Sequence, residues 1–327
     1  MPCFNKNMGQ SSLAAQTFEQ RVAPTLCVQF EELIDHFLRS HDVKEISRDG
    51  YRRRLRQFFK WCLENNVSQP TREIILQYKR YLQAKGFTPT SECAYMVAVR
   101  TFFTWAETEK LYPNVAKGIR GAKRQKGFRR DPLTVPQVHE LLSSIDRTTL
   151  KGHRDFALLN LMIRTGPRTI EITRANIGDL RQQSGQTVLW LQGKGSDVPD
   201  AFVVLTDETL RPILEYLSAR GTSKETEPLF GSTSDNSLHQ RMTTKSVRRI
   251  VKTRLRGIKI DTLRLSAHSL RHTAVTLALI GGASIQEAQQ MARHADLNTT
   301  LIYSHNIQRS AGVPERKIDE VLKPTAT

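Results

Sequence analysis

A basic, glycine-containing run divides this chain into two parts that differ in their pattern of apolar residues. The run extends from Lys117 to Arg130 and holds seven basic residues, three glycines and no acidic residue. Such a composition is typical of a solvated linker, and a basic linker can also lie along a phosphate backbone. Because the chain has 327 residues, it can build a hydrophobic core on each side of the run. We therefore predict two domains joined by a basic linker over residues 116–131.

The part before the linker shows helical periodicity and no strand pattern. Residues 1–25 are polar and aperiodic, so we expect a flexible N-terminus there. Over residues 26–115, apolar residues recur at helical spacing in four segments that begin near residues 28, 47, 70 and 88. Four helices without a strand predict a small bundle, which by itself would fit any helical adaptor.

The part after the linker mixes helices with a β-hairpin. Helical patterns cover residues 134–142, 154–163, 206–219 and 243–254, and strand patterns cover residues 188–191 and 202–205. Residues 304–314 are a loose stretch that contains Gly and Pro, and residues 314–322 offer one more short helix. We predict a mainly α fold with a small β-hairpin over residues 132–310, followed by a tail over residues 311–327.

Charge and composition restrict the partners that the chain can have. The net charge is +17 and the pI is near 10.0. Because the charge is clustered, it indicates a polyanion bound through salt-dependent phosphate contacts. Four cysteines lie in the amino-terminal third without metal-ligand spacing, which favours reduced thiols. We see no apolar run long enough to span a bilayer and no signal-peptide pattern, so we expect a cytoplasmic, nucleoid-associated protein with no membrane partner.

The stretch from His268 to Tyr303 gathers side chains that suit an anionic substrate. His268, Arg271 and His272 fall at positions i, i+3 and i+4, so one helical face can carry all three. A glycine pair then ends this helix, and a capping-box pattern starts a second one. His294 follows that second helix, and Tyr303 comes near the end of a short polar segment. Imidazoles, a guanidinium and a phenol could thus converge.

Three interpretations of this stretch compete. The simplest is a helical core with polar residues at its rim. A second is a zinc site, because His268 and His272 have zinc-binding spacing. A hydrolytic zinc helix needs Glu where Ser269 stands, and no cysteine lies nearby, so we expect no metal. The third is phosphate chemistry, in which Arg271 holds non-bridging oxygens, the histidines move protons and Tyr303 attacks.

Four separated segments favour the third interpretation through a family resemblance. Residues 268–272 have the sequence HSLRH, and residues 293–305 have the sequence RHADLNTTLIYSH. Together they resemble the carboxy-terminal signature of the tyrosine recombinases, the phage integrase family. The family's upstream arginine box is similar to TGPRTIE at residues 165–171, and its hairpin lysine corresponds to Lys194. The resemblance covers nearly the whole chain from about Leu26 onward, and it implies a site-specific recombinase of the Xer/integrase kind.

The resemblance implies a set of residues that cleave a DNA strand. The catalytic residues are Arg168, Lys194, His268, Arg271, His294 and Tyr303, and the supporting residues are Glu171 and His272. Arg168 and Arg271 would neutralise the non-bridging oxygens of a phosphodiester, and Glu171 would hold an arginine in place.

The proton transfers follow from the same resemblance. Tyr303 would attack the phosphorus with His268 as its proton acceptor, while His272 would be structural. Lys194 would protonate the leaving 5′ oxygen, and His294 would donate a hydrogen bond to the phosphate. The product is a 3′-phosphotyrosyl enzyme, and its rejoining to a strand needs no ATP, metal or other cofactor.

The implied partner is double-stranded DNA with short inverted-repeat sites. The amino-terminal bundle would be the SAM-like core-binding domain, and the basic helix over residues 243–254 would enter the major groove. The residues expected to contact DNA are Arg52, Arg53, Arg56, Lys117, Arg120, Lys123, Arg124, Lys126, Arg129, Arg130, Lys245, Arg248, Arg249 and Lys252. The family also implies a homo-oligomer, a tetramer on DNA, in which the tail packs on a neighbouring protomer.

Two biological roles and two other functions are compatible with these residues. The roles are integration and excision of a mobile element, or resolution of replicon dimers. The other functions are strand cleavage and religation of the type IB topoisomerase kind, and DNA binding without catalysis. The sequence departs from the family at Pro167, where an aliphatic residue is common, and at Arg293, where glycine is common. After the hairpin lysine it has Asp197, Val198 and Asp200 where further basic residues are common.

Overall fold

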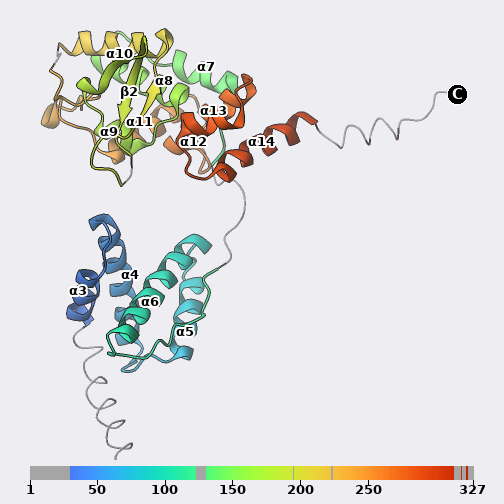
Figure 1. Ribbon diagram of the computed structural model, residues 1–327. Coiled ribbons are helices and arrows are strands. Elements are labelled where there is room, and N and C mark those ends of the chain that lie inside the picture. Colours follow the sequence, from blue (N-terminus) through green and yellow to red (C-terminus); the bar gives the residue numbers. More distant parts are fainter. Residues whose placement is uncertain are drawn as a thin grey trace, which may run out of the picture. The chain divides into compact units, whose positions relative to one another are not determined.

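The computed structural model describes residues 30–122, 130–193, 195–221 and 224–312, together with residues 318 and 322 (Figure 1). The expected flexible segment 1–25 lies outside the described residues. The chain forms two compact units, which divide between residues 126 and 127, inside the basic run. The fold is mainly helical with one small sheet, as the sequence predicts. In the described ranges, no helix is both long and apolar enough to cross a membrane.

The described residues of the first unit form a bundle of four helices, which confirms the four helices that the sequence predicts there. Its helices are α3 (Phe30–Ser40), α4 (Glu45–Glu64), α5 (Arg72–Ala84) and α6 (Pro89–Thr108). Aromatic rings fill its core, where Phe37, Phe58 and Phe102 are fully or almost fully buried. Ala116 and Ile119 belong to the same core, although the sequence analysis assigns them to the linker. The packed unit therefore continues past residue 115, because the first apolar side chains of the linker are buried against the bundle.

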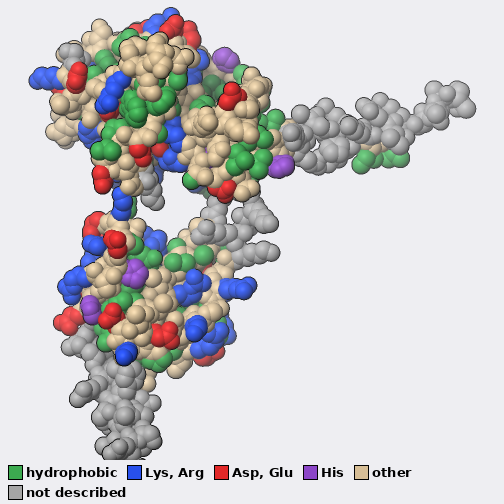
Figure 2. Space-filling view, viewed as in Figure 1, with side chains coloured by type: hydrophobic (Ala, Val, Ile, Leu, Met, Phe, Trp, Pro, Cys, Tyr) green, Lys and Arg blue, Asp and Glu red, His purple; other side chains and the backbone are tan. Residues whose placement is uncertain are grey.

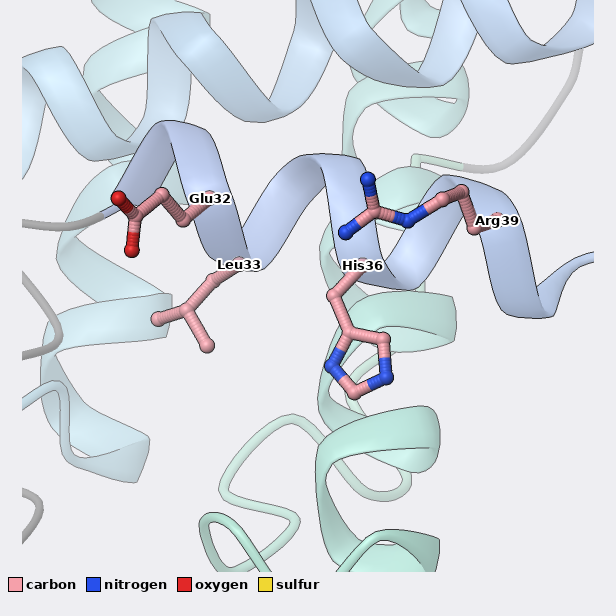
Figure 3. A pocket seen from close by; sticks show the side chains of 4 residues that line it. All are labelled: Glu32, Leu33, His36 and Arg39. Atoms are coloured by element: carbon pink, nitrogen blue, oxygen red, sulfur yellow. The ribbon is translucent and has the colours of Figure 1, made fainter.

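An open pocket lies along α3. Its lining side chains are those of Glu32, Leu33, His36 and Arg39, which project from successive turns of the helix (Figure 3). The ring of His36 packs edge-on against Trp105 of α6, with 5.1 Å between ring centroids. This surface presents no convergent set of groups comparable to the one in the second unit.

The second unit surrounds a three-stranded antiparallel sheet. The strands are β1 (Leu180–Gln183), β2 (Gln186–Leu191) and β3 (Ala201–Val204), in the order β1-β2-β3. Leu189 of the central strand lies opposite Leu180 on one side and Val203 on the other. The predicted hairpin is confirmed as β2 and β3. The sequence analysis missed β1 because its segment Leu-Arg-Gln-Gln carries almost no apolar pattern.

A buried helix sets the position of the candidate site. The helices around the sheet are α7 (Val135–Ser143), α8 (Leu150–Thr165), α9 (Thr169–Arg174), α10 (Asp207–Arg220) and α11 (Thr244–Gly257), with 3-10 turns at Ile177–Asp179 and Asp235–Ser237. Helix α8 packs against α10 and α12 (Ala267–Ile280), and most of its side chains are buried. Gly166 ends α8 with φ 61°, a left-handed conformation that glycine adopts without a steric cost. The chain can therefore turn at once into α9.

Three helices at the carboxy-terminal end pack on one another. They are α12, α13 (Ile285–Ala292) and α14 (Leu297–Gly312), drawn side by side in orange to red in Figure 1. The predicted capping box is confirmed, because Ser284 Oγ accepts from Glu287 N at 3.2 Å and Ser284 N donates to Glu287 Oε2 at 2.7 Å. Tyr303 lies within α14. The expectation of a polar segment followed by a loose stretch is therefore wrong over residues 304–312, which are helical.

Candidate active site

Two arginines that are 103 residues apart in the sequence, Arg168 and Arg271, donate to neighbouring backbone carbonyls at residues 293 and 292. Arg168 occupies the N-cap position of α9, and its Nη2 donates to the carbonyl oxygen of Arg293 at 3.3 Å. Arg271 belongs to α12, and its guanidinium donates to the carbonyl oxygens of Gly166, at 2.7 Å from Nη1, and of Ala292. Arg271 is 2% exposed, whereas the side chain of Arg168 is 38% exposed. The structure thus brings the two predicted arginines together.

Glu171 holds two arginines rather than one. Its carboxylate accepts from Arg168 Nη1 at 2.8 Å, from the Arg168 backbone N–H at 2.7 Å and from Arg293 Nη2 at 2.8 Å. Burial alone would raise the pKa of this fully buried carboxyl, but the charge of Arg293 and the bonds from Arg168 hold the pKa below its ordinary value. Glu171 is therefore an ionised anchor beneath the arginines. This contact agrees with the supporting role that the sequence analysis gives it.

The arginines stand in an environment that strengthens their electrostatic effect. Burial, together with the charges of Arg168 and Arg293, lowers the pKa of Arg271 to about 10. Arg271 still carries its proton at neutral pH. The three arginines carry three positive charges, and Glu171 balances only one of them. Because the site is desolvated, water does not screen the remaining positive charge from a phosphodiester.

Tyr303 is buried and contacts a histidine. Its hydroxyl forms a hydrogen bond with Nδ1 of His272, and the two rings lie 5.2 Å apart between centroids. Tyr303 is 3% exposed and packs in a small cluster with Val275, Ala288 and Ala292. Burial raises the pKa of Tyr303 to about 12, although the charge of Arg271 acts in the opposite direction.

The three histidines surround Tyr303 in different ways. His272 is largely buried, and burial with its cationic neighbours lowers its pKa to about 4, so it is neutral at pH 7. His268 is exposed, its ring packs edge-on against that of His272 at 4.6 Å, and desolvation with the charge of Arg271 lowers its pKa. His294 stacks on Tyr303 at 6.2 Å, and its Nδ1 bonds Thr300 Oγ1 at 2.9 Å. Burial and Arg271 lower the pKa of His294 to about 4.

The sequence analysis and the structure differ over which histidine meets the tyrosine. The sequence analysis makes His268 the proton acceptor and His272 structural. In the structure the hydroxyl of Tyr303 is bonded to His272, one helical turn further along α12. His272 thus contacts the residue that the family resemblance makes the nucleophile, and the roles of the two histidines stay predictions. The spacing of one turn leaves both histidines on the helix face that borders Tyr303.

Lys194 lies outside the described residues, but the base of its loop is described. Arg174, in the last turn of α9, donates to the carbonyl oxygen of Gly193 at 2.7 Å. Asp200 Oδ1 accepts from Gly193 N at 3.4 Å. The hairpin base is thus attached to the helix that also carries Glu171. The sequence analysis did not single out Arg174, and its only local signal is a basic residue one turn after Glu171 on the same short helix.

The predicted DNA contacts in the first unit begin with α4. Arg52 donates to Asp35 at 3.0 Å, and Arg56 makes a bidentate pair with Glu31 of α3, at 2.8 Å from Nε and 2.9 Å from Nη2. Arg53 is exposed. Carboxylates of α3 therefore compensate the charge of Arg52 and Arg56 before any DNA binds.

The first two basic side chains of the run are exposed, while their backbone carbonyls are held by α5. Lys117 and Arg120 are exposed, and their carbonyl oxygens accept from Arg72 at 2.6 Å and Lys79 at 3.0 Å of α5. Arg130, at the start of the second unit, donates to a backbone carbonyl of the loop that precedes α12. The predicted contacts Lys123, Arg124, Lys126 and Arg129 lie outside the described residues.

Helix α11 keeps most of its predicted basic surface. Lys245, Arg248 and Arg249 are exposed. Lys252 instead pairs with Asp261 and donates to the carbonyl oxygen of Thr262 at 2.8 Å. Figure 2 shows Lys and Arg side chains on the visible face of each unit, together with Asp and Glu side chains. Within the part of the chain that the structure describes, no group of three or more His, Cys, Asp or Glu side chains could hold a metal ion.

Comparison with known proteins gives the same two-part division. Residues 132–309 match the phage integrase family, and residues 30–110 match the phage integrase N-terminal SAM-like domain. The chain is 32% identical over 263 residues to the tyrosine recombinase XerC of Pelobacter propionicus, which covers 78% of this chain and 83% of that protein. It is 28% identical over 290 residues to a tyrosine recombinase of Synechococcus elongatus, which covers 84% of this chain and 89% of that protein.

A solved structure shares the fold. The XerH site-specific recombinase, in a post-cleavage complex with palindromic difH substrate, aligns over 94% of this chain and 92% of its own with a TM-score of 0.68 and 19% identity. A SAM-like helical unit followed by an integrase catalytic unit defines a class of DNA strand-exchange enzymes. The chain belongs to the phage integrase family and is a tyrosine recombinase.

Proposed function

We propose that this tyrosine recombinase cleaves and rejoins DNA strands through a 3′-phosphotyrosyl intermediate on Tyr303. The observation that carries the proposal is the convergence of Arg168 and Arg271 beside Tyr303. Both guanidiniums bond the segment around residues 292 and 293, and Ala292 packs against the tyrosine. Two of the five N–H groups of Arg271 donate to backbone carbonyls, and the others can donate to a phosphate.

The proposed reaction needs neither a metal ion nor a nucleotide. The Tyr303 oxygen forms a bond to phosphorus, the bond from phosphorus to the 5′ oxygen breaks, and that oxygen takes a proton from Lys194. Arg168 and Arg271 neutralise the charge that grows on the pentacoordinate phosphorus, and His294 donates a further hydrogen bond. Because the phosphotyrosyl bond retains the free energy of the phosphodiester, a 5′-hydroxyl of another strand can reverse the reaction.

Cleavage requires that Tyr303 leave its buried position. Because Tyr303 is only 3% exposed, DNA cannot reach its hydroxyl in this conformation. The conformation with the Tyr303–His272 bond is therefore a resting state. We propose that α14 shifts when DNA binds and that exposed His268 then accepts the tyrosine proton. A second assignment, with His272 as acceptor, is favoured by the contact between its Nδ1 and the hydroxyl.

The proposed substrate is double-stranded DNA with short inverted repeats. The XerH complex contains a palindromic substrate, and this chain has a net charge of +17. Exposed Arg53 in the first unit, and Lys245, Arg248 and Arg249 in the second, would contact the phosphates and groove. The protein would act on cytoplasmic, nucleoid DNA, either in integration and excision of a mobile element or in resolution of replicon dimers. Genomic crosslinking sites at element ends or at a replication terminus would distinguish the two roles.

We also propose a tetramer on DNA in which the tail packs on a neighbouring protomer. Leu322 N donates to the carbonyl oxygen of Ile318 at 2.9 Å, as in a helical turn, and these two apolar side chains are 72% and 56% exposed. Exposed apolar residues one turn apart suit burial against a second subunit. Truncation after Ser310 is expected to abolish assembly on paired sites, and fully active tetramers from the truncated protein would contradict the proposal.

A suicide substrate tests the function as a whole. The probe is a duplex nicked near the cleavage point, built on the sequence that the full-length protein selects from a random DNA library. We expect a denaturation-resistant protein–DNA adduct with the wild type and none with Tyr303→Phe. A selected duplex that is bound but never forms an adduct would identify a non-catalytic DNA-binding protein. Cleavage and religation without exchange between two sites would identify a topoisomerase-like enzyme.

A further inference from the structure

Arg293 stands at an unusual position for a large side chain. It ends α13 with φ 54°, in the left-handed region, where non-glycine residues are uncommon. The resemblance to the family places glycine there. A left-handed conformation costs free energy for a residue with a Cβ, which directs attention to the contacts that the Arg293 side chain makes.

The contacts of Arg293 lead to the substrate-binding arginine. Its Nη2 pairs with Glu171 Oε2 at 2.8 Å, and its Nη1 donates to the carbonyl oxygen of Met291 at 2.7 Å. The side chain is only 12% exposed. Glu171 holds Arg168 through its other oxygen, Oε1, and the carbonyl oxygen of Arg293 accepts from Arg168 Nη2. One residue therefore restrains Arg168 twice, through a shared carboxylate and through its own backbone.

The charges explain why a second cation on Glu171 matters. With Arg168 alone, the buried carboxylate would form a neutral pair and compete with a phosphate for the same guanidinium. With Arg293 present, one negative charge is shared between two positive charges, and the trio keeps a net charge of +1. Arg271 adds another, so the site carries about +2 toward a phosphodiester whose charge rises from −1 toward −2 in the transition state.

We propose that Arg293 is a positioning residue for strand cleavage, which acts through Glu171 to hold Arg168 in place and to leave its charge available to the scissile phosphate. The inference rests on the proposed function. Arg293 itself, buried beneath Arg168, does not touch the DNA.

Single-turnover cleavage of two suicide duplexes tests this assignment. One duplex carries the natural scissile phosphate and the other a neutral methylphosphonate at the same position. Arg293→Gln is expected to cleave the natural duplex slower by on the order of 10²-fold, the cost of a misplaced catalytic group. Its DNA affinity stays unchanged. On the methylphosphonate duplex its rate is expected to match that of the wild type, because a neutral centre does not need the full charge of Arg168.

Matched variants separate positioning from folding and from general charge. Arg293→Gly removes the left-handed strain and should show the same loss, whereas Arg293→Lys should recover part of the rate. Arg211→Gln removes an exposed arginine, 66% accessible, and should leave both rates unchanged. Natural-duplex cleavage at the wild-type rate by Arg293→Gln overturns the inference, and so does an equal loss on both duplexes. A wild type that forms no Tyr303 adduct overturns the proposed function, and the inference falls with it.

Discussion

In the proposed mechanism, the bond between Tyr303 and His272 holds the nucleophile in a resting state. Burial raises the pKa of Tyr303 to about 12, so almost no tyrosinate exists at neutral pH in this position. Because burial and its neighbours lower the pKa of His272 to about 4, the ring that bonds the Tyr303 hydroxyl is neutral at pH 7. The arginine pair can stabilise the anion only after the hydroxyl approaches it. If Tyr303 is the nucleophile, as proposed, the buried arrangement would protect DNA from cleavage outside an assembled complex.

Substitution of the two α12 histidines distinguishes the proton acceptor from the resting-state partner. We expect His268→Phe to slow adduct formation on the suicide duplex by roughly 10²- to 10⁴-fold, the usual contribution of a general base. His272→Phe should change the rate by only a few-fold, because its bond to Tyr303 is broken before attack. Rapid-quench measurement of the adduct checks both. The reverse order of effects would assign the proton to His272.

The buried histidines also make stability depend on pH. His272 and His294 have pKa values of about 4 in the folded protein, below the ordinary value near 6.5. Between these values the unfolded chain binds more protons, so stability rises with pH and is lost as pH falls from about 6.5 to about 4. We expect wild type to lose on the order of 3 kcal/mol per histidine across this window, at about 1.4 kcal/mol for each unit of pKa. Urea unfolding at pH 5 and pH 7 should show a smaller difference in His272→Gln than in wild type.

At the scale of the elements, local sequence patterns predict most helices, whereas contacts between distant residues determine the geometry of the candidate site. The capping box of Ser284 with Glu287 and the glycine that ends α8 are visible within a few residues, so the sequence predicts both helix boundaries. The pair between Glu171 and Arg293 joins residues 122 positions apart, and no local pattern indicates it. Helix α14 escaped prediction because its first turns are polar. The family resemblance, rather than periodicity, selected the arginines, histidines and tyrosine that the fold brings together.

Gly166, in the turn between α8 and α9, tests how closely this turn must pack against α12. A Cβ on Gly166 would lie 3.2 Å from the Ala274 Cβ and 3.7 Å from the Arg271 side chain, at φ +61°. We expect Gly166→Ala to destabilise the protein by more than about 1 kcal/mol, the cost of the left-handed backbone alone, and to slow cleavage. Gly185→Ala is the control, because Gly185 has φ +75° with nothing within 4 Å. Equal losses of unfolding free energy in urea for both variants would show that crowding against Ala274 adds nothing to the cost of the left-handed backbone.

At the scale of the whole molecule, the 49 Lys and Arg side chains outnumber those that are free to meet DNA, because carboxylates already pair with some of them. Carboxylates of α3 pair with Arg52 and Arg56, and Asp261 pairs with Lys252. The sequence predicts these residues as part of a basic surface, because it does not show which carboxylates pair with them. The exposed residues of α11 are the part of that surface that the fold leaves open in the second unit.

The salt dependence of binding separates open from compensated charges on α11. Each phosphate contact that is lost makes the slope of log K against log salt less steep by about 0.9, because fewer counterions are released. Arg248, which is exposed, should show this change on substitution by Gln, together with weaker binding to every duplex. Lys252→Gln should change the slope less than Arg248→Gln, because Lys252 pairs with Asp261, a carboxylate that also accepts from Arg256. Fluorescence anisotropy over a range of salt concentrations measures both slopes. An equal decrease for the two variants would mean that DNA displaces Asp261 and that ion pairs in the free protein do not restrict the binding surface.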